Sequence, residues 1–146
     1  MQILELGHVV LYVTNLELVA NFYRDTLGFR EIHRESQIAL FSSGRTHHEM
    51  LLIEIGGTPK PQHIPEPGLY HIGFKVANSH EELKVIYKEL INNRVPILGL
   101  TDHVVTHSIY ITDPDGNELE LYADVSDAWK TDPTAVLSPP QPLSLD

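Results

Sequence analysis

Two short stretches of the chain share one alternation of apolar and polar positions. They are "GHVVLYVTN" (7–15) and "GLYHIGFKVAN" (68–78). An apolar side chain at every second position predicts a strand with one buried face in each stretch. His8 and His71 begin these strands, and the constant offset between the two copies indicates an internal repeat. Both histidines are expected to face away from the side on which helices pack.

A helix is predicted after each of these two strands, because apolar residues then recur at helical spacing. They are Leu18, Val19, Phe22 and Tyr23 in the first half, and Leu83, Ile86, Tyr87, Leu90 and Ile91 in the second. Ser79 and Glu82 form a capping-box pattern, which predicts where the second helix begins.

Three further strands are predicted after each helix. They are Arg30–Glu35, Ile38–Phe41 and Glu49–Ile55 in the first half, and Ile97–Leu100, Ser108–Thr112 and Glu118–Tyr122 in the second. The pattern therefore predicts an α+β fold of two tandem βαβββ modules, about residues 1–57 and 68–124. The modules are expected to pair into one curved mixed-sheet cup, lined by the faces opposite the helices, within a single domain over residues 1–124.

Two segments lie outside the modules. The stretch "GGTPKPQHIPEPG" (56–68) is rich in proline and glycine, which disfavour helix and strand and predict an extended linker. Residues 125–146 include "DPTAVLSPPQPLSLD", which is too rich in proline for a core element. We expect this proline-rich C-terminal tail to be loose or to wrap an edge of the fold.

Composition narrows the range of partners. The 146 residues include 10 basic and 20 acidic side chains, for a net charge of −10, which repels phosphate backbones and anionic lipids. Nucleic acid and membrane are therefore not expected as partners.

The chain has no cysteine and nine histidines, so nitrogen and oxygen atoms would have to hold any metal. The start of the sequence has no features of a secretory leader, which favours the cytoplasm.

A carboxylate suited to join the two histidines lies in "YITDPDGNELELYAD". The Asp113–Gly116 turn is expected to close a hairpin. On the returning strand Glu118 and Glu120 share one face, and the leucines between and after them share the other. Glu120 lies deeper in the strand and is the candidate ligand, whereas Glu118 is expected at the solvated rim.

The stretches "GHVVLYVTNLELVANFYRDTLGF", "GLYHIGFKV" and "HSIYITDPDGNELELYAD" resemble the vicinal oxygen chelate superfamily (glyoxalase, bleomycin resistance protein and extradiol dioxygenase). Within it, they are similar to the extradiol catechol 2,3-dioxygenases, and the resemblance spans nearly all of residues 3–124. It implies that His8, His71 and Glu120 are three metal ligands. Such a facial triad leaves open positions and is typical of non-haem Fe(II) oxygenases. Mn(II) is the other ion expected of an extradiol site.

The resemblance also implies roles for residues around the metal. In "HHEMLLIEI", His48 would line the cup and hydrogen-bond the oxygen co-substrate, while His47, of opposite strand parity, would point outward. In "DHVVTHSIY", His103 would be the acid–base histidine and Tyr110 would orient the catecholate. His107 is close enough in sequence to take the place of His103 in a shifted alignment.

The reaction implied is oxidative ring opening of a catechol-type aromatic diol by O2 to a muconic semialdehyde, a step of aromatic compound catabolism. A diol that binds through both oxygens fills two open positions of such a metal and leaves a third for O2. A histidine has a suitable pKa range to take the diol proton and return one later. Besides the diol and O2, a second copy of the chain in a homodimer is the remaining candidate partner.

Two alternatives stay open. Glu54, in "LLIEI", falls where the glyoxalase I branch of the superfamily has a fourth, carboxylate ligand. Two histidines and two glutamates would suit Zn(II) or Ni(II) and an isomerisation without oxygen. The other alternative is a small-molecule binding module with no turnover.

Overall fold

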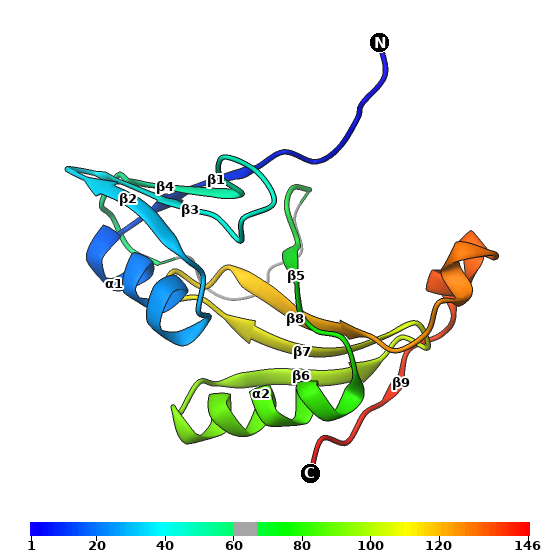
Figure 1. Cartoon of the computed structure of the whole chain (residues 1–146). Helices are drawn as coiled ribbons and strands as arrows, with labels where there is room; N and C mark the ends of the chain where they lie inside the picture. The colour runs from blue at the N-terminus through cyan, green and yellow to red at the C-terminus, as the bar shows by residue number, and fades with distance from the viewer. Residues whose placement is uncertain (60–66) are drawn as a thin grey trace. The chain divides into compact units, whose positions relative to one another are not determined.

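The computed structural model describes residues 1–59 and 67–146, and it is traced from the N-terminus to the C-terminus in Figure 1. Contacts within the chain divide it into two compact units. The first is Met1–Gln62 with Asp113–Gly116, and the second is His63–Thr112 with Asn117–Asp146. Most of the predicted linker lies outside the described residues.

The first unit contains a helix packed on a sheet of four strands, counted over the described residues. Its elements are β1 (Val9–Val13), α1 (Leu16–Asn21), a π-helical turn (Phe22–Thr26), β2 (Glu31–Glu35), β3 (Ile38–Phe41) and β4 (Met50–Glu54). The strand order is β1-β4-β3-β2, with β1 parallel to β4 and the other pairs antiparallel. The predicted βαβββ order of this half is confirmed.

Alternation of side chains determines which face of β1 is buried. Leu11 and Val13 lie in the core, whereas Tyr12 between them is exposed. The following helix is capped by Asn15, whose side chain accepts a hydrogen bond of 2.9 Å from Leu18 N. Leu18 itself is exposed, so the apolar face predicted for this helix is shifted by one position.

The turn Asp113–Gly116 belongs to the first unit, although the strands on either side of it belong to the second. Thr14 donates to Asp115 through its backbone N (2.7 Å to Oδ2) and its hydroxyl (2.5 Å to Oδ1). The hydroxyl of the fully buried Tyr23 donates to Asp113 Oδ2 at 3.1 Å. Burial, with the negative charge of Asp113 second, raises the pKa of Tyr23, which therefore stays a hydrogen-bond donor. These bonds tie the turn to the first sheet and helix.

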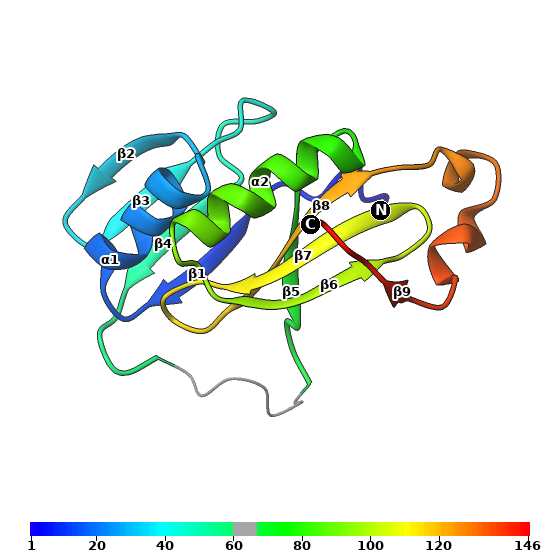
Figure 2. The same ribbon diagram turned by 90° about the horizontal axis from the view of Figure 1, so that it is seen from below.

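The second unit repeats the βαβββ order and adds a strand from the tail. Its elements are β5 (His71–Ala77), α2 (His80–Asn92), β6 (Ile97–Asp102), β7 (Thr106–Thr112), β8 (Glu118–Asp124), two 3₁₀ turns (Ala128–Lys130 and Pro133–Leu137) and β9 (Gln141–Pro142). The strand order in the described residues is β5-β8-β7-β6-β9, with β5 parallel to β8. Helix α2 packs along one face of this sheet, as Figure 2 shows. The predicted α+β class and the second βαβββ module are confirmed.

The start of α2 agrees with the capping pattern in the sequence. Ser79 Oγ accepts a hydrogen bond of 3.2 Å from Glu82 N, and Glu82 Oε2 accepts one of 2.8 Å from Asn78 N. Leu83 and Leu90 are buried against the sheet. The helix therefore begins where the sequence predicts and buries part of the predicted apolar face.

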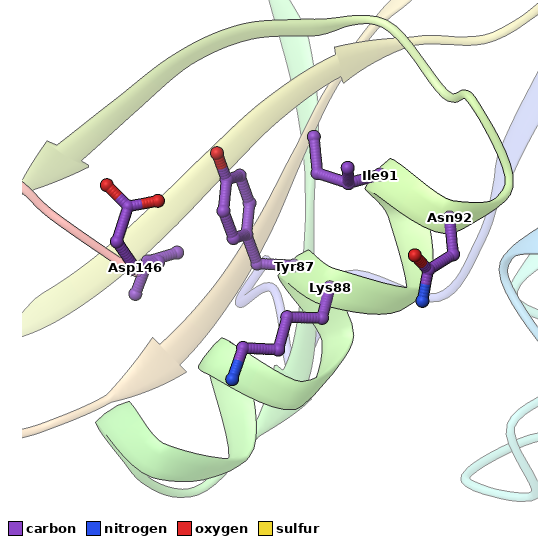
Figure 3. A pocket seen from close by; sticks show the side chains of 6 residues that line it. Tyr87, Lys88, Ile91, Asn92 and Asp146 are labelled. Atoms are coloured by element: carbon purple, nitrogen blue, oxygen red, sulfur yellow. The ribbon is translucent and has the colours of Figure 1, made fainter.

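The C-terminal tail wraps the edge of the second sheet. Strand β9 pairs with β6, Leu145 is fully buried, and Lys84 Nζ donates to the backbone oxygen of Asp146. An open surface pocket lies at this junction (Figure 3). Its lining residues are Tyr87, Lys88, Ile91, Asn92, Leu145 and Asp146. None of the residues predicted for chemistry is among them.

Candidate functional site

Four polar side chains of the second unit lie on the sheet face opposite α2. They are His71, Ser108, Tyr110 and Glu120. On β8, Leu119 and Leu121 are buried on the helix side, so Glu120 between them faces the other side. The register places Tyr110 of β7 and Gly73 of β5 on the two sides of Glu120. Alternation then places His71 and Ser108 on the same face.

His71 and Glu120 lie in contact. His71 Nε2 is 3.2 Å from Glu120 Oε2. A Cβ at Gly73 would lie 3.5 Å from that same oxygen, so the glycine leaves the carboxylate uncovered. Within the described part of the chain the buried His71 Nδ1 has no hydrogen-bond partner, and Glu118 Oε1 is 3.7 Å away. A carboxylate behind the second ring nitrogen is the usual companion of a metal-binding histidine.

Glu118 is buried, so the prediction that it is solvated at the rim is wrong. Only 7% of it is exposed. The parallel register pairs Glu118 with His71, and a hydrogen bond with Glu118 is the largest of the causes that raise the pKa of Tyr70. Proximity to the turn in sequence did not expose this side chain, which lies beside His71 on the adjoining strand and near Tyr70.

The other carboxylate oxygen of Glu120, Oε1, accepts hydrogen bonds from two side chains of β7. Ser108 Oγ donates to Glu120 Oε1 at 2.6 Å, and the Tyr110 hydroxyl donates to it at 3.2 Å. Ser108 is fully buried. Burial first, and the negative charge of Glu120 second, raise the pKa of Tyr110, which therefore stays protonated and able to donate. Glu120 Oε2 is thus directed toward His71. Ser108 has no sequence signal of its own beyond the strand parity that it shares with Tyr110.

His103 extends this set of contacts. It lies in the loop between β6 and β7, where its backbone N donates to Thr106 O at 2.8 Å. His103 Nε2 is 2.8 Å from the Tyr110 hydroxyl. His107 has the parity of the buried Ile109 and so lies on the opposite face, toward α2. The structure thus brings together His71, Glu120, Tyr110 and His103, and it places His107 elsewhere.

The first unit holds His8 and His48. Their rings lie 4.6 Å apart between centroids. Arg45 donates to the backbone oxygens of Leu6 (3.1 Å) and Gly7 (3.0 Å), which fixes the segment just before His8. Arg45 was not recognised in the sequence, because its partners are backbone atoms nearly 40 residues away.

His47 does not separate from His48 as the sequence analysis expected. The two Nδ1 atoms are 2.6 Å apart, and the His47 ring is 6.3 Å from that of His8. Strand parity does not apply here, because both residues precede β4, which begins at Met50. Burial first, then the nearby His47 and His8, lower the pKa of His48 and favour its neutral form.

Glu54 does not occupy the position expected of a fourth ligand. Its Oε2 accepts a hydrogen bond of 2.6 Å from Leu16 N at the start of α1. Glu54 pairs with Val13 at the far end of β1 from His8, a separation of about 17 Å at about 3.3 Å per residue. The residue that matches Glu120 in register is instead Leu51, opposite Val10. The glyoxalase-like interpretation of Glu54 is therefore not supported by this geometry.

The donors of the second unit fit a divalent metal ion. Ligand atoms at neighbouring octahedral positions, each about 2.1 Å from an ion, are about 3 Å apart, close to the 3.2 Å between His71 Nε2 and Glu120 Oε2. An imidazole with a carboxylate suits Fe(II) or Mn(II). No group of three or more His, Cys, Asp or Glu side chains within residues 1–59 and 67–146 is arranged to hold a metal. His8, the third predicted ligand, belongs to the first unit.

Comparison with known proteins defines the class. The family model of the Glyoxalase/Bleomycin resistance protein/Dioxygenase superfamily matches residues 5–121, and the chain belongs to this family. A catechol-2,3-dioxygenase of Bacillus subtilis is 30% identical over 87% of this chain and 44% of the relative. A biphenyl-2,3-diol 1,2-dioxygenase of Rhodococcus globerulus is 29% identical over 82% of this chain and 63% of its own length. The chain thus spans about half to two thirds of these relatives.

Solved structures agree on the fold. A glyoxalase/dioxygenase from Nostoc punctiforme has a TM-score of 0.69 at 18% identity, over 84% of this chain and 92% of the other. A lactoylglutathione lyase from Agrobacterium tumefaciens has a TM-score of 0.63 at 21% identity, over 84% of this chain and 96% of the other.

The helices in residues 1–59 and 67–146 include no segment with the length and apolar character of a membrane span.

Proposed function

We propose that the protein is a metal-dependent extradiol dioxygenase that opens the ring of a catechol-type aromatic diol with O2. The observation that carries the proposal is the continuous set of contacts from His71 through Glu120 and Tyr110 to His103. It combines a metal-ligand pair with an uncharged phenol and an imidazole suited to proton transfer. Relatives named for catechol and biphenyl-2,3-diol cleavage support this choice of substrate class.

We propose His71, Glu120 and His8 as the ligands of an Fe(II) ion, with Mn(II) as the alternative. His71 and Glu120 are supported by their 3.2 Å contact, and His8 by the internal repeat that matches it to His71. These three residues would hold the ion, which would supply a binding site for the diol oxygens and O2 and a path for electrons between them. Three protein ligands would leave positions open for these molecules.

The remaining residues would orient the diol and move its protons. The protonated Tyr110 hydroxyl would donate a hydrogen bond to the deprotonated diol oxygen. His103, 2.8 Å from that hydroxyl, would accept the second diol proton and return one to the product. His48, held in its neutral form, would donate a hydrogen bond to O2 from its ring N–H.

The test is a paired assay on the full chain. Protein loaded anaerobically with Fe(II) and then given catechol or 2,3-dihydroxybiphenyl in air should consume one O2 per diol and form a yellow semialdehyde. The same preparation, and one loaded with Zn(II) or Ni(II), should be inert toward the hemithioacetal of methylglyoxal and glutathione. Oxygen-independent isomerisation would reject the dioxygenase proposal in favour of a glyoxalase. Inactivity in both assays across a panel of diols would favour a binding module.

A further inference from the structure

A second pair of histidines lies in the second unit, on the α2 side of the sheet. His80 Nδ1, at the first residue of α2, is 2.9 Å from His107 Nδ1 of β7. The two rings are nearly perpendicular, at 85° with centroids 5.0 Å apart. The two rings thus present their Nδ1 atoms to each other at hydrogen-bond distance.

The other ring nitrogen of His107 faces a carboxylate. Asp102 of β6 is the cross-strand partner of His107, and its Oδ2 lies 3.6 Å from His107 Nε2. Asp102 Oδ1 accepts a hydrogen bond of 2.6 Å from Val104 N, which fixes the carboxylate in place. A carboxylate on the far nitrogen orients a metal-binding histidine and makes it a stronger ligand.

We propose that His80 and His107 bind a divalent ion of the zinc type through their Nδ1 atoms, with Asp102 orienting His107. Tetrahedral ligand atoms about 2.05 Å from zinc are about 3.3 Å apart, so the two nitrogens need to separate by only a few tenths of an ångström. Two imidazoles leave the remaining positions to water, which can enter because 17% of the His107 side chain is exposed. The sheet separates this site from His71 and Glu120.

The charge state of the pair favours a metal. Two Nδ1 atoms in a hydrogen bond share one proton, so one of the two Nδ1 atoms is unprotonated and accepts through its lone pair. Burial lowers the pKa of His107 and favours its neutral imidazole, while the negative charge of Asp102 acts in the opposite direction. Neutral imidazole is the form that binds zinc, and the ion would displace the shared proton.

Zn(II) stoichiometry of the full chain, measured by equilibrium dialysis, tests the site. The variants His80→Ala and His107→Gln should each bind one Zn(II) fewer per chain than the wild type. Asp102→Asn should keep the ion but bind it about 10- to 100-fold more weakly. His33→Ala is the matched control, because His33 is an exposed histidine beside Glu35 and its loss should change nothing.

The test compares the Zn(II) count of each variant with that of the wild type. Any metal bound by His71 and Glu120 contributes equally to both counts, so the test remains valid if the dioxygenase proposal fails. Circular dichroism reports whether each variant is folded. If His107→Gln does not fold, His80→Ala decides, because His80 is a partly exposed residue at the start of a helix. An unchanged Zn(II) count in folded His80→Ala overturns the site, and unchanged affinity in Asp102→Asn overturns the role of Asp102.

Discussion

The two βαβββ modules have the same strand order and differ in the chemistry of one sheet face. In each module the strand that begins at or directly after a predicted metal-binding histidine runs parallel to the module's last strand. In the second module Glu120 and Tyr110 are cross-strand partners on that face, and the equivalent partners in the first module are Leu51 and Leu40. In the proposed ligand set the two modules would therefore contribute one histidine each, and only the second would contribute a carboxylate. The repeated backbone has the same strand order in both modules. The leucines at the two equivalent positions of the first module add no further ligand, so the proposed metal would keep positions free for substrate.

The largest effect is expected when the second module is given the leucine that the first module has at the position equivalent to Glu120. Glu120→Leu removes the carboxylate that contacts His71 and should reduce metal affinity by more than about a hundredfold, a larger loss than that of a supporting group. Diol cleavage should fall below detection. Metal content by mass spectrometry and O2 uptake measure the two effects, with Glu120→Asp as the conservative variant. Normal metal content in Glu120→Leu would reject Glu120 as a ligand.

The second prediction separates proton transfer from metal binding. His103→Ala removes the imidazole 2.8 Å from the Tyr110 hydroxyl and should lower turnover by about 10²- to 10⁴-fold, with metal content unchanged. His33→Ala serves as the control, with normal turnover. Loss of metal from His103→Ala would instead make His103 a ligand.

A smaller effect is expected from the residue that orients Glu120. Ser108→Ala removes the 2.6 Å hydrogen bond to Glu120 Oε1 and should weaken metal binding by about 10- to 100-fold. Ser108→Thr keeps a hydroxyl and should recover part of the affinity. Ser42→Ala is the matched control in the first module, because Ser42 is equally buried but donates to Thr46 O. Competition with a chromogenic chelator measures the affinity, and equal losses in both alanine variants would contradict a specific role for Ser108.

The smallest effect is expected at Glu54. Glu54→Gln weakens the hydrogen bond to Leu16 N and removes a negative charge from the start of α1, which should reduce the free energy of unfolding by about 1 kcal/mol. Metal content and turnover should not change. Urea unfolding measures the first quantity, and a drop in metal content would restore Glu54 as a ligand.

Much of the fold was predictable because local patterns determine it. Alternation of apolar residues located β1 and β5, and the repeat between them located His8 and His71. Parity then placed Glu120 on the face opposite the helix. These inferences succeeded because the period of a strand is a local property of the chain. Strand β9 was missed, since two residues are too short to show a period.

The errors came from contacts that a local pattern does not contain. Glu54 was a candidate ligand from its place in "LLIEI", but the register of β1 and β4 pairs it with Val13, at the far end of β1 from His8. Glu118 was expected in solvent because it is close to a turn, but it is buried and pairs in register with His71 on the next strand. Ser108 was not noticed, because a buried serine in a strand gives no sign of its partner until the register of β7 and β8 is known.

The turn Asp113–Gly116 limits how this chain can be divided. The linker between the repeats looks like a natural place to separate two halves. A first half cut there would lose both carboxylates that accept hydrogen bonds from Thr14 and the buried Tyr23. Loss of each hydrogen bond to a charged carboxylate would cost about 1.5–3 kcal/mol. The two repeats therefore cannot simply be exchanged for one another. A design that transfers the first half to another protein must include residues 113–116 as well.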